Sequence, residues 1–306
     1  MNNKKIEISI LNVNNLIKEQ FQEYSHLEIK PVETSGWDNK TFKLGESISI
    51  RLPSAECYIN QVNKEQKWLP ILKQHLSIPI SEPIKMGLPS SDYPWNWSIY
   101  KWINGKSANI YNFNENCLNK IALELANFLN ELHTIDISLD LNNELTAGDH
   151  NFHRGGSLEF YNNEFINNIT NLKNNNFDID YEKINIIWQK AISSKWNNKS
   201  VFIHGDLSSG NIIIENNNLK GIIDFGQLGI GDPACDLVIS WTFLDNESRK
   251  IFKLNLNNID ADTWIRAYGW CIWKSIITIN SIDDKNSIKV IEQKNIIDNI
   301  LKEFSI

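Results

Sequence analysis

The sequence predicts an α+β fold in which a small, sheet-rich N-terminal lobe precedes a larger, mainly helical C-terminal lobe. Two observations lead to this prediction. Short extended runs separated by glycine-bearing turns fill much of the first hundred residues, a pattern typical of an antiparallel sheet. After residue 115, apolar residues recur at helical spacing in long segments. The character changes near residues 101–106, so we expect an N-terminal lobe of residues 1–101 and a C-terminal lobe of residues 102–306.

The N-terminal lobe is predicted to contain two helices and an antiparallel meander. Glycine turns at Gly36-Trp-Asp-Asn and Gly45-Glu separate the extended runs, and Pro70 would kink or end the second helix. In chain order the elements are a helix over 6–25, extended runs over 27–34, 40–44 and 47–52, a helix over 60–75, a proline-rich extended stretch over 77–94 and a strand over 97–103.

The C-terminal lobe is predicted to be a set of long helices with three short strands between them. The strands are apolar runs of two or three residues, and an Asn-rich polar stretch at 171–180 is expected to be a loop. The helices are expected over 115–134, 157–172, 180–196, 260–281 and 285–304, and the strands over 201–203, 212–214 and 222–223.

Composition limits the class of protein. Hydrophobic residues make up 42% and charged residues 22% of the chain, which is ordinary for a globular protein. The net charge of −7 and the absence of a basic stripe argue against a nucleic-acid partner. No apolar run approaches the length of a membrane span, and the N-terminus lacks the features of a signal peptide. We therefore expect a cytoplasmic monomer, with its four widely spaced cysteines reduced.

The most informative stretch is His204-Gly-Asp206-Leu-Ser-Ser-Gly-Asn211, followed thirteen residues later by Asp224-Phe-Gly226. Asp206 and Asn211 have the spacing of the kinase catalytic loop. Carboxylate and amide oxygens suit magnesium, while a separate Asp must remain available to orient a hydroxyl proton. If 211–215 pairs with 219–223 as a hairpin, Asn211 and Asp224 emerge at the same end.

The segment 201–238 resembles the aminoglycoside phosphotransferase family of small-molecule kinases through its ordered HGD, N, DFG, GDP and D motifs. The resemblance extends over residues 33–245 and is looser over the final 60. It implies a protein-kinase-like, two-lobed fold with the nucleotide between the lobes. It also implies Mg²⁺-dependent transfer of the γ-phosphoryl group of ATP or GTP to a hydroxyl of a small molecule.

By this resemblance Asp206 is the catalytic, base-like residue, and Asn211 and Asp224 bind magnesium. Each could instead be an ordinary loop or turn residue. His204 is expected to hold the loop rather than to react. Asp232 before Pro233 predicts a helix start, and Asp236 on the first turn is expected to brace the catalytic loop.

Arg51 departs from the family pattern, in which a strand lysine contacts the phosphates and pairs with a helix glutamate. Only four of the 30 basic residues are arginines, which suggests that a planar guanidinium is required where one is kept. Arg51 can hold phosphate oxygens bidentately, with Glu65 as its expected partner and Glu56 as the rival. The alternative is a surface arginine on the strand.

Two further segments are expected to contact the nucleotide. The turn that contains Trp37, Asp38 and Asn39 is placed over the phosphates, although many such turns are simple hairpins. Lys101, Trp102 and Ile103 are expected to offer backbone groups to the purine. Tyr100 would lie at the back of this pocket, where it could favour GTP or serve only as a core aromatic.

Acceptor recognition is assigned to the helical lobe, where the sequence is least informative. Asp149, His153 and Glu159 are the candidate substrate residues, and Arg154 is expected to form a salt bridge within the lobe. An aminoglycoside-type antibiotic is the leading acceptor. A macrolide, or a metabolite alcohol such as choline, homoserine or a sugar, is the alternative. The alternative from a different functional class is a catalytically inactive nucleotide-binding protein. The intact Asp206, Asn211 and Asp224 argue against this alternative.

Overall fold

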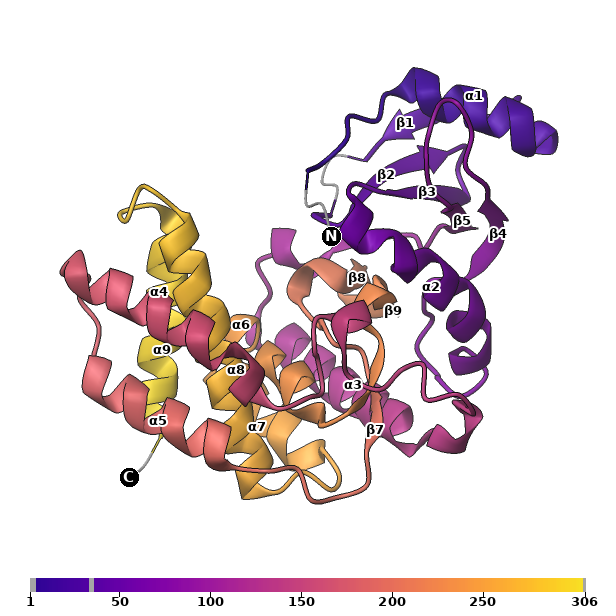
Figure 1. Cartoon of the computed structure of the whole chain (residues 1–306). Coiled ribbons are helices and arrows are strands. Elements are labelled where there is room, and N and C mark those ends of the chain that lie inside the picture. Colours follow the sequence, from indigo (N-terminus) through magenta and orange to yellow (C-terminus); the bar gives the residue numbers. More distant parts are fainter. Residues whose placement is uncertain (1–3, 33–35, 305–306) are drawn as a thin grey trace. The chain divides into compact units, whose positions relative to one another are not determined.

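The computed structural model describes residues 4–32 and 36–304 (Figure 1). The chain forms two compact units: unit 1 contains Met1–Ser107 and Asn211–Gln227, and unit 2 contains Ala108–Gly210 and Leu228–Ile306. The lobes expected from the sequence, 1–101 and 102–306, remain a sequence-based division. The compact units differ from that division most clearly in the segment 211–227, which belongs to unit 1.

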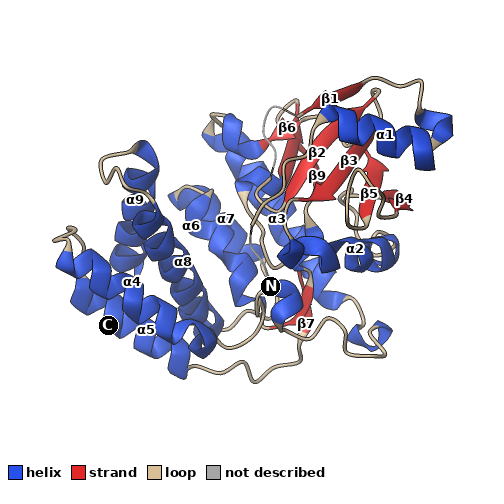
Figure 2. Cartoon of the chain, turned by 45° about the horizontal axis from the view of Figure 1, so that its top comes forward, coloured by secondary structure: helices blue, strands red, loops and turns tan. Residues whose placement is uncertain are grey.

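Unit 1 is built on a five-stranded antiparallel sheet, drawn in red in Figure 2. The strand order is β1-β2-β3-β5-β4. The strands are β1 (Ile29–Pro31), β2 (Asn39–Leu44), β3 (Ile48–Pro53), β4 (Pro83–Gly87) and β5 (Trp97–Lys101).

The two faces of this sheet have different chemistry because successive side chains in a strand point to opposite faces. On one face, Ile50 and Leu52 join an apolar core with Leu16 and Ile17 of α1 (Ile10–Gln20). The other face is polar and meets α2 (Ile59–Leu72), whose Glu65 is buried there. The polar residues on this face are Ser49, Arg51, Ser98 and Tyr100.

The predicted hairpin is confirmed within unit 1. Strand β8 (Ile212–Glu215) pairs antiparallel with β9 (Asn218–Ile222), and β6 (Lys106–Ser107) lies on the other side of β8. The amide of Ile223 donates to the carbonyl of Asn211 at 2.9 Å. This bond closes the open end of the hairpin, so Asn211 and Asp224 do emerge together.

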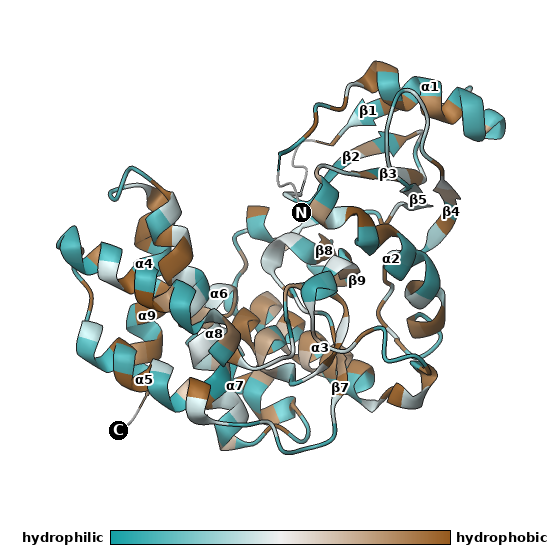
Figure 3. Cartoon of the chain, viewed as in Figure 1, coloured by the Kyte–Doolittle hydropathy of each residue, from teal (hydrophilic) through white to brown (hydrophobic). Residues whose placement is uncertain are grey.

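Unit 2 is mainly helical. Helix α8 is its longest helix and packs against α4, α5 and α9. Apolar and polar residues alternate along α4 and α5 in Figure 3, so these helices bury one side and expose the other. The helices are α3 (Glu115–Thr134), α4 (Asn162–Asn174), α5 (Tyr181–Ser193), α6 (Ile239–Thr242), α7 (Asn246–Asn255), α8 (Ala261–Ser281) and α9 (Ile288–Glu303).

Most long elements match the sequence prediction, and the differences lie at ends and in short elements. Helix α1 begins only at Ile10, because the side chain of Ser9 caps it by accepting from the amide of Asn12. Pro70 does not end α2, which continues to Leu72. The helix predicted from residue 157 begins with a 3₁₀ turn, Leu158–Tyr161. Helices α6 and α7 and the strands β6 and β10 (Gly229–Gly231) were not predicted.

The cysteines and the membrane prediction can be compared with the structure directly. All four cysteines are free thiols, and Cys235 and Cys271 are buried. Within residues 4–32 and 36–304, every helix is too short or too polar to cross a bilayer.

Glycines join the 148–156 loop to β10 in unit 2. Strand β10 pairs with β7 (Val201–Ile203), which leads directly into the segment that contains Asp206. The amide of Asp232 donates to the carbonyl of Gly155 at 2.8 Å. A Cβ atom at Gly231 would lie 2.2 Å from that carbonyl oxygen. Gly231 therefore permits a backbone contact that no other residue could make.

We expect Gly231→Ala to lower the free energy of unfolding by about 1–3 kcal/mol, the usual effect of overpacking a tight contact. Gly148→Ala in the same loop is the matched control, because its Cβ would meet only ordinary contacts, the nearest at 3.7 Å. Urea unfolding measures both variants. Equal stabilities would show that the backbone contact at Gly231 is not tight.

Candidate active site

The loop after β7 is held by one buried carboxylate. Asp236, in the 3₁₀ helix Pro233–Val238, accepts hydrogen bonds from the amides of His204 and Gly205 at 2.7 and 2.8 Å. Burial raises the pKa of Asp236, although both amides oppose this shift. The amide of Asp206 in turn donates to Nδ1 of the buried His204 at 3.2 Å. Asp236 and His204 thus fix the backbone that carries Asp206.

Asp232 anchors the start of the same 3₁₀ helix. Its side chain accepts from the amide of Ala234, with Pro233 at the first helical position, so the predicted helix start is confirmed. Its carboxylate also forms a buried ion pair with Arg266 of α8, at 2.6 Å. Burial raises the pKa of Asp232, and the neighbouring Arg266 opposes that rise. Asp232 therefore joins the segment carrying Asp236 to α8.

Asp206 forms an ion pair that the sequence analysis did not anticipate. Nζ of Lys274, on α8, lies 2.9 Å from Oδ1 of Asp206, and both side chains remain about two-fifths exposed. Burial alone would raise the pKa of Asp206. The positive charge of Lys274, assisted by Arg154, outweighs burial and lowers it. Asp206 is thus held as a carboxylate.

Unit 1 carries the two predicted magnesium ligands. Asn211 precedes β8, and Asp224 follows β9 with φ of 67°, a left-handed conformation that Asp tolerates better than most residues. A Cβ at Gly36 would lie 3.8 Å from Oδ2 of Asp224, so the backbone of the 36–39 turn approaches this carboxylate. Two oxygen-bearing side chains at the open end of one hairpin fit a hard cation such as Mg²⁺.

Arg51 connects this carboxylate to α2. Its guanidinium lies 2.5 Å from Oδ1 of Asp224 and 3.1 Å from Oε1 of Glu65. The Tyr100 hydroxyl donates to Oε2 of Glu65 at 2.5 Å. Burial and the nearby Glu65 raise the pKa of Tyr100, so its hydroxyl keeps the proton that it donates. Of the two glutamates considered, Glu65 is the one paired with Arg51.

The turn over the expected phosphate position is held mainly through Asp38. Its carboxylate accepts from the side-chain amides of Gln61, at 2.9 Å, and Gln227, at 3.3 Å. Trp37 is 76% exposed, with the ammonium of Lys5 lying 3.4 Å from its ring centroid. Asn39 is buried at the start of β2. The structure therefore gives Asp38 an anchoring contact.

The predicted purine-binding segment uses part of its backbone internally. The amide of Lys101 donates to the carbonyl of Glu82, and the amide of Trp102 donates to the carbonyl of Ser47, both at 2.8 Å. The side chain of Ile103 lies against Gly221, where a Cβ would come within 2.8 Å of it. Among the described residues, the amide of Ile103 donates to no protein acceptor. Of the three amides, that of Ile103 is therefore the one left available to a ligand.

The three candidate substrate residues are not part of the pocket beside Asp206. Asp149 and Glu159 are exposed, and His153 stacks on Phe160 with ring centroids 3.6 Å apart. Nε2 of His153 lies 3.1 Å from Oδ1 of Asp149. None of the three lines the pocket that contains Asp206.

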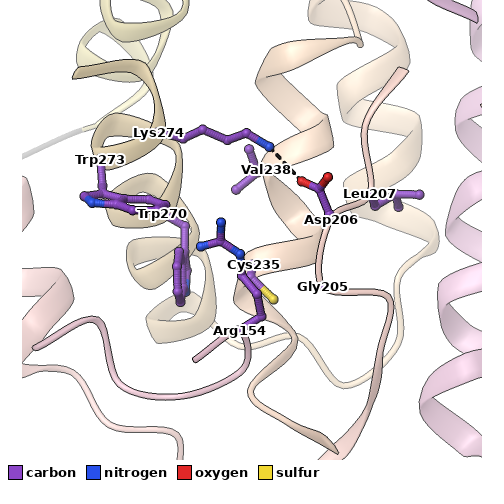
Figure 4. A pocket seen from close by; sticks show the side chains of 9 residues that line it. All are labelled: Arg154, Gly205, Asp206, Leu207, Cys235, Val238, Trp270, Trp273 and Lys274. Atoms are coloured by element: carbon purple, nitrogen blue, oxygen red, sulfur yellow. Dashed lines mark hydrogen bonds and ion pairs between the residues drawn. The ribbon is translucent and has the colours of Figure 1, made fainter. Parts of the chain in front are cut away.

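The salt bridge expected for Arg154 is wrong for the described part of the chain. Its guanidinium carbon lies 5.0 Å from the ring centroid of Trp270 and 4.9 Å from that of Trp273, so the contact is a cation–π interaction. Arg154 does line the pocket with Asp206 and Lys274, as Figure 4 shows.

One sequence signal could have identified part of this arrangement. Arg266, Trp270, Trp273 and Lys274 have the spacing i, i+4, i+7 and i+8, which places them along one side of α8. That stripe includes one of the four scarce arginines. The partners of Arg266 and Lys274 are distant in the chain, so only the fold identifies Asp232 and Asp206 as their counter-ions.

Comparisons with known proteins agree with the resemblance inferred from the sequence. The Phosphotransferase enzyme family matches residues 28–270. An aminoglycoside 3'-phosphotransferase of Acinetobacter baumannii is 24% identical over 233 residues, covering 74% of this chain and 83% of that protein. One of Escherichia coli is 43% identical over 54 residues, covering 18% of this chain and 20% of that protein.

Solved structures share the fold at low sequence identity. The GDP and kanamycin complex of APH(2")-IIia has a TM-score of 0.73 at 18% identity, covering 96% of this chain and 100% of that one. The macrolide 2'-phosphotransferase MphH from Brachybacterium faecium has a TM-score of 0.58 at 13% identity, covering 87% and 91%. The predicted kinase-like fold class is confirmed. Because the family match spans most of the chain, the protein belongs to the phosphotransferase enzyme family and is a kinase-type enzyme with a hydroxyl acceptor.

Proposed function

We propose that this enzyme transfers the γ-phosphoryl group of ATP or GTP to a hydroxyl of a small molecule in a Mg²⁺-dependent reaction. The observation that carries the proposal is the cluster at the end of the β8–β9 hairpin, where Asp224 contacts Arg51 and Arg51 contacts Glu65. A triphosphate with its bound cation requires a carboxylate that holds the cation and a guanidinium that binds phosphate oxygens, and this cluster contains both groups.

Different residues of the chain bind the phosphates, hold the magnesium ion and orient the acceptor hydroxyl. Arg51, oriented by Glu65 and Tyr100, binds phosphate oxygens. Asn211 and Asp224 would hold Mg²⁺, which neutralises charge on the triphosphate when it is bound. Asp206, held as a carboxylate by Lys274, orients the acceptor hydroxyl and takes its proton. Because the transition state of phosphoryl transfer is loose, positioning and charge stabilisation account for most of the rate gain.

The acceptor has two candidates, each favoured by a different observation. The names of the relatives favour an aminoglycoside-type antibiotic, the acceptor expected from the sequence resemblance. The pocket beside Asp206 favours a less cationic alcohol, because its lining includes the positively charged side chains of Arg154 and Lys274. A coupled nucleotide-consumption screen with ATP and GTP separately, over aminoglycosides, macrolides and small alcohols, decides between them. Nucleotide binding without turnover on any acceptor would instead support an inactive protein.

Replacing Asp206 by asparagine should lower kcat by roughly 100-fold or more while nucleotide affinity is kept, because a positioned base contributes on this scale. Asp178→Asn is the control, since Asp178 is almost fully exposed and pairs with Lys294 on the surface. Steady-state kinetics and nucleotide titration measure the two effects. A near-wild-type kcat for Asp206→Asn would remove Asp206 from the mechanism.

Replacing Asp224 by alanine should abolish the magnesium dependence of nucleotide binding, because the cation would lose its carboxylate ligand. The test is calorimetric titration of ATP and GTP with and without Mg²⁺. The Mg²⁺-free titration is the internal control, since it reports any indirect effect through the loss of the Arg51 contact. An unchanged gain in affinity on adding Mg²⁺ would show that Asp224 is not a ligand.

Arg51→Ala and Glu65→Ala should each reduce kcat/KM for the nucleotide, and the double variant should lose little more than either single one. Glu65 acts by orienting Arg51, so its loss matters little once Arg51 is gone. Arg51→Lys should restore part of the activity, because charge returns without the bidentate fork. The exposed Lys30–Glu28 pair is the matched control and should give small effects. Small, additive effects at Arg51 and Glu65 would leave the phosphate contact unassigned.

A further inference from the structure

A pocket lies within unit 2 beside the carboxylate of Asp206 (Figure 4). Four parts of the chain supply it: the loop that carries Arg154, the segment Gly205–Leu207, the 3₁₀ helix Pro233–Val238, and helix α8. The α8 stripe contributes two indole rings and an ammonium group. The residues that matter for its chemistry are Arg154, Asp206, Trp270, Trp273 and Lys274.

The charge of this lining is positive. Asp206 is the single carboxylate among the lining residues, and Lys274 is already paired with it at 2.9 Å. Arg154 therefore remains as a surplus cation, because the described chain places no carboxylate in an ion pair with it. Several ammonium groups of a polycationic acceptor would meet like charge here, and such juxtaposition opposes binding.

The Arg154 side chain is also held in position. Its guanidinium lies close to both indoles, at 5.0 and 4.9 Å from their centroids. A planar guanidinium on aromatic faces loses little further freedom when it binds, and its N–H groups match two oxygens of a carboxylate or phosphate. Arg154 is therefore preorganised to bind an oxyanion.

Trp270 supplies a second, independent observation. This residue is 2% exposed and lines the pocket, and its indole N–H has no hydrogen-bond partner among the described residues. A buried donor without an acceptor is rare in folded proteins.

We propose that the pocket binds an acceptor alcohol that carries an anionic group, a carboxylate or a phosphate, which Arg154 binds while the hydroxyl lies beside Asp206. This inference rests on the proposed phosphoryl transfer and names its acceptor class. The transferred group forms a P–O bond to the acceptor oxygen, the bond to the nucleoside diphosphate breaks, and the hydroxyl proton passes to Asp206.

The test uses the full-length protein and probes of matched carbon skeleton. Glycerate and glycerol 3-phosphate are compared with glycerol, and gluconate and glucose 6-phosphate with glucose. Kanamycin serves as the polycation. Calorimetric binding is measured for each probe independently of turnover, and Mg²⁺-dependent nucleotide consumption is measured separately.

We expect at least one anionic probe to bind at least about tenfold more tightly than its neutral parent, as a charge-assisted hydrogen bond would give. The carboxylate and phosphate arms show which anion is preferred. Arg154→Met should remove this preference and leave nucleotide affinity unchanged, and Arg154→Lys should keep part of it. Lys190→Met is the matched control, because Lys190 lies over the Phe304 ring outside the pocket. In the wild-type protein, the preference should shrink with salt, a readout that does not depend on any variant folding.

The results separate failure of the acceptor class from failure of the proposed function. Anion binding that depends on Arg154, without nucleotide consumption, would contradict the phosphoryl transfer and leave the pocket assignment standing. Turnover of kanamycin alone, equal binding of anionic and neutral probes, no binding of any anionic probe, or a preference unchanged in Arg154→Met would each overturn the inference.

Discussion

The buried carboxylate of Asp236 is the contact on which the active-site loop depends. Two successive amides, of His204 and Gly205, donate to its two oxygens, and Gly205 itself has a φ of 83°. A carboxylate placed out of water needs compensating hydrogen bonds or charges, so the loop and the 3₁₀ helix carrying Asp236 depend on each other. The ion pair between Asp232 and Arg266 links the 3₁₀ helix to α8. Lys274, on the same side of α8, forms an ion pair with Asp206, so α8 also contacts the loop directly.

The polar face of the unit 1 sheet obeys a similar rule. A guanidinium beneath a sheet is tolerated because each of its neighbours carries the complementary charge or a hydrogen bond: Glu65, Asp224 and Tyr100. Removing one member of such a buried set leaves the others uncompensated. The opposite face needs only apolar shape, and α1 provides it. Strand alternation thus places a charged site and a hydrophobic core on the two sides of one layer.

The parts predicted from sequence are those with local signals. Long amphipathic patterns predicted helices such as α3 and α8 almost to the residue, and the hairpin followed from two short apolar runs. Helix α7 was missed because NESRKIFKLN has few apolar residues and buries Ser248 and Arg249. The scarcity of arginine identified Arg51 as important. The Lys274–Asp206 pair spans 68 residues, and the bond from Tyr100 to Glu65 depends on strand register, so neither has a local signal. Arg154 was misassigned because a salt bridge was expected where two indoles provide the contact.

The segment Asn211–Gln227 belongs to unit 1, although the chain on either side of it belongs to unit 2. Neither unit is therefore a single continuous stretch. During synthesis, unit 1 lacks its β8–β9 hairpin until residue 227 has left the ribosome, and unit 2 is incomplete until its last helices follow. In many proteins the N-terminal domain folds before the next domain is synthesised. This chain cannot follow that order, because unit 1 includes a segment that is synthesised after the first part of unit 2. No single cleavage point separates the two units, so the nascent enzyme must mature as one entity.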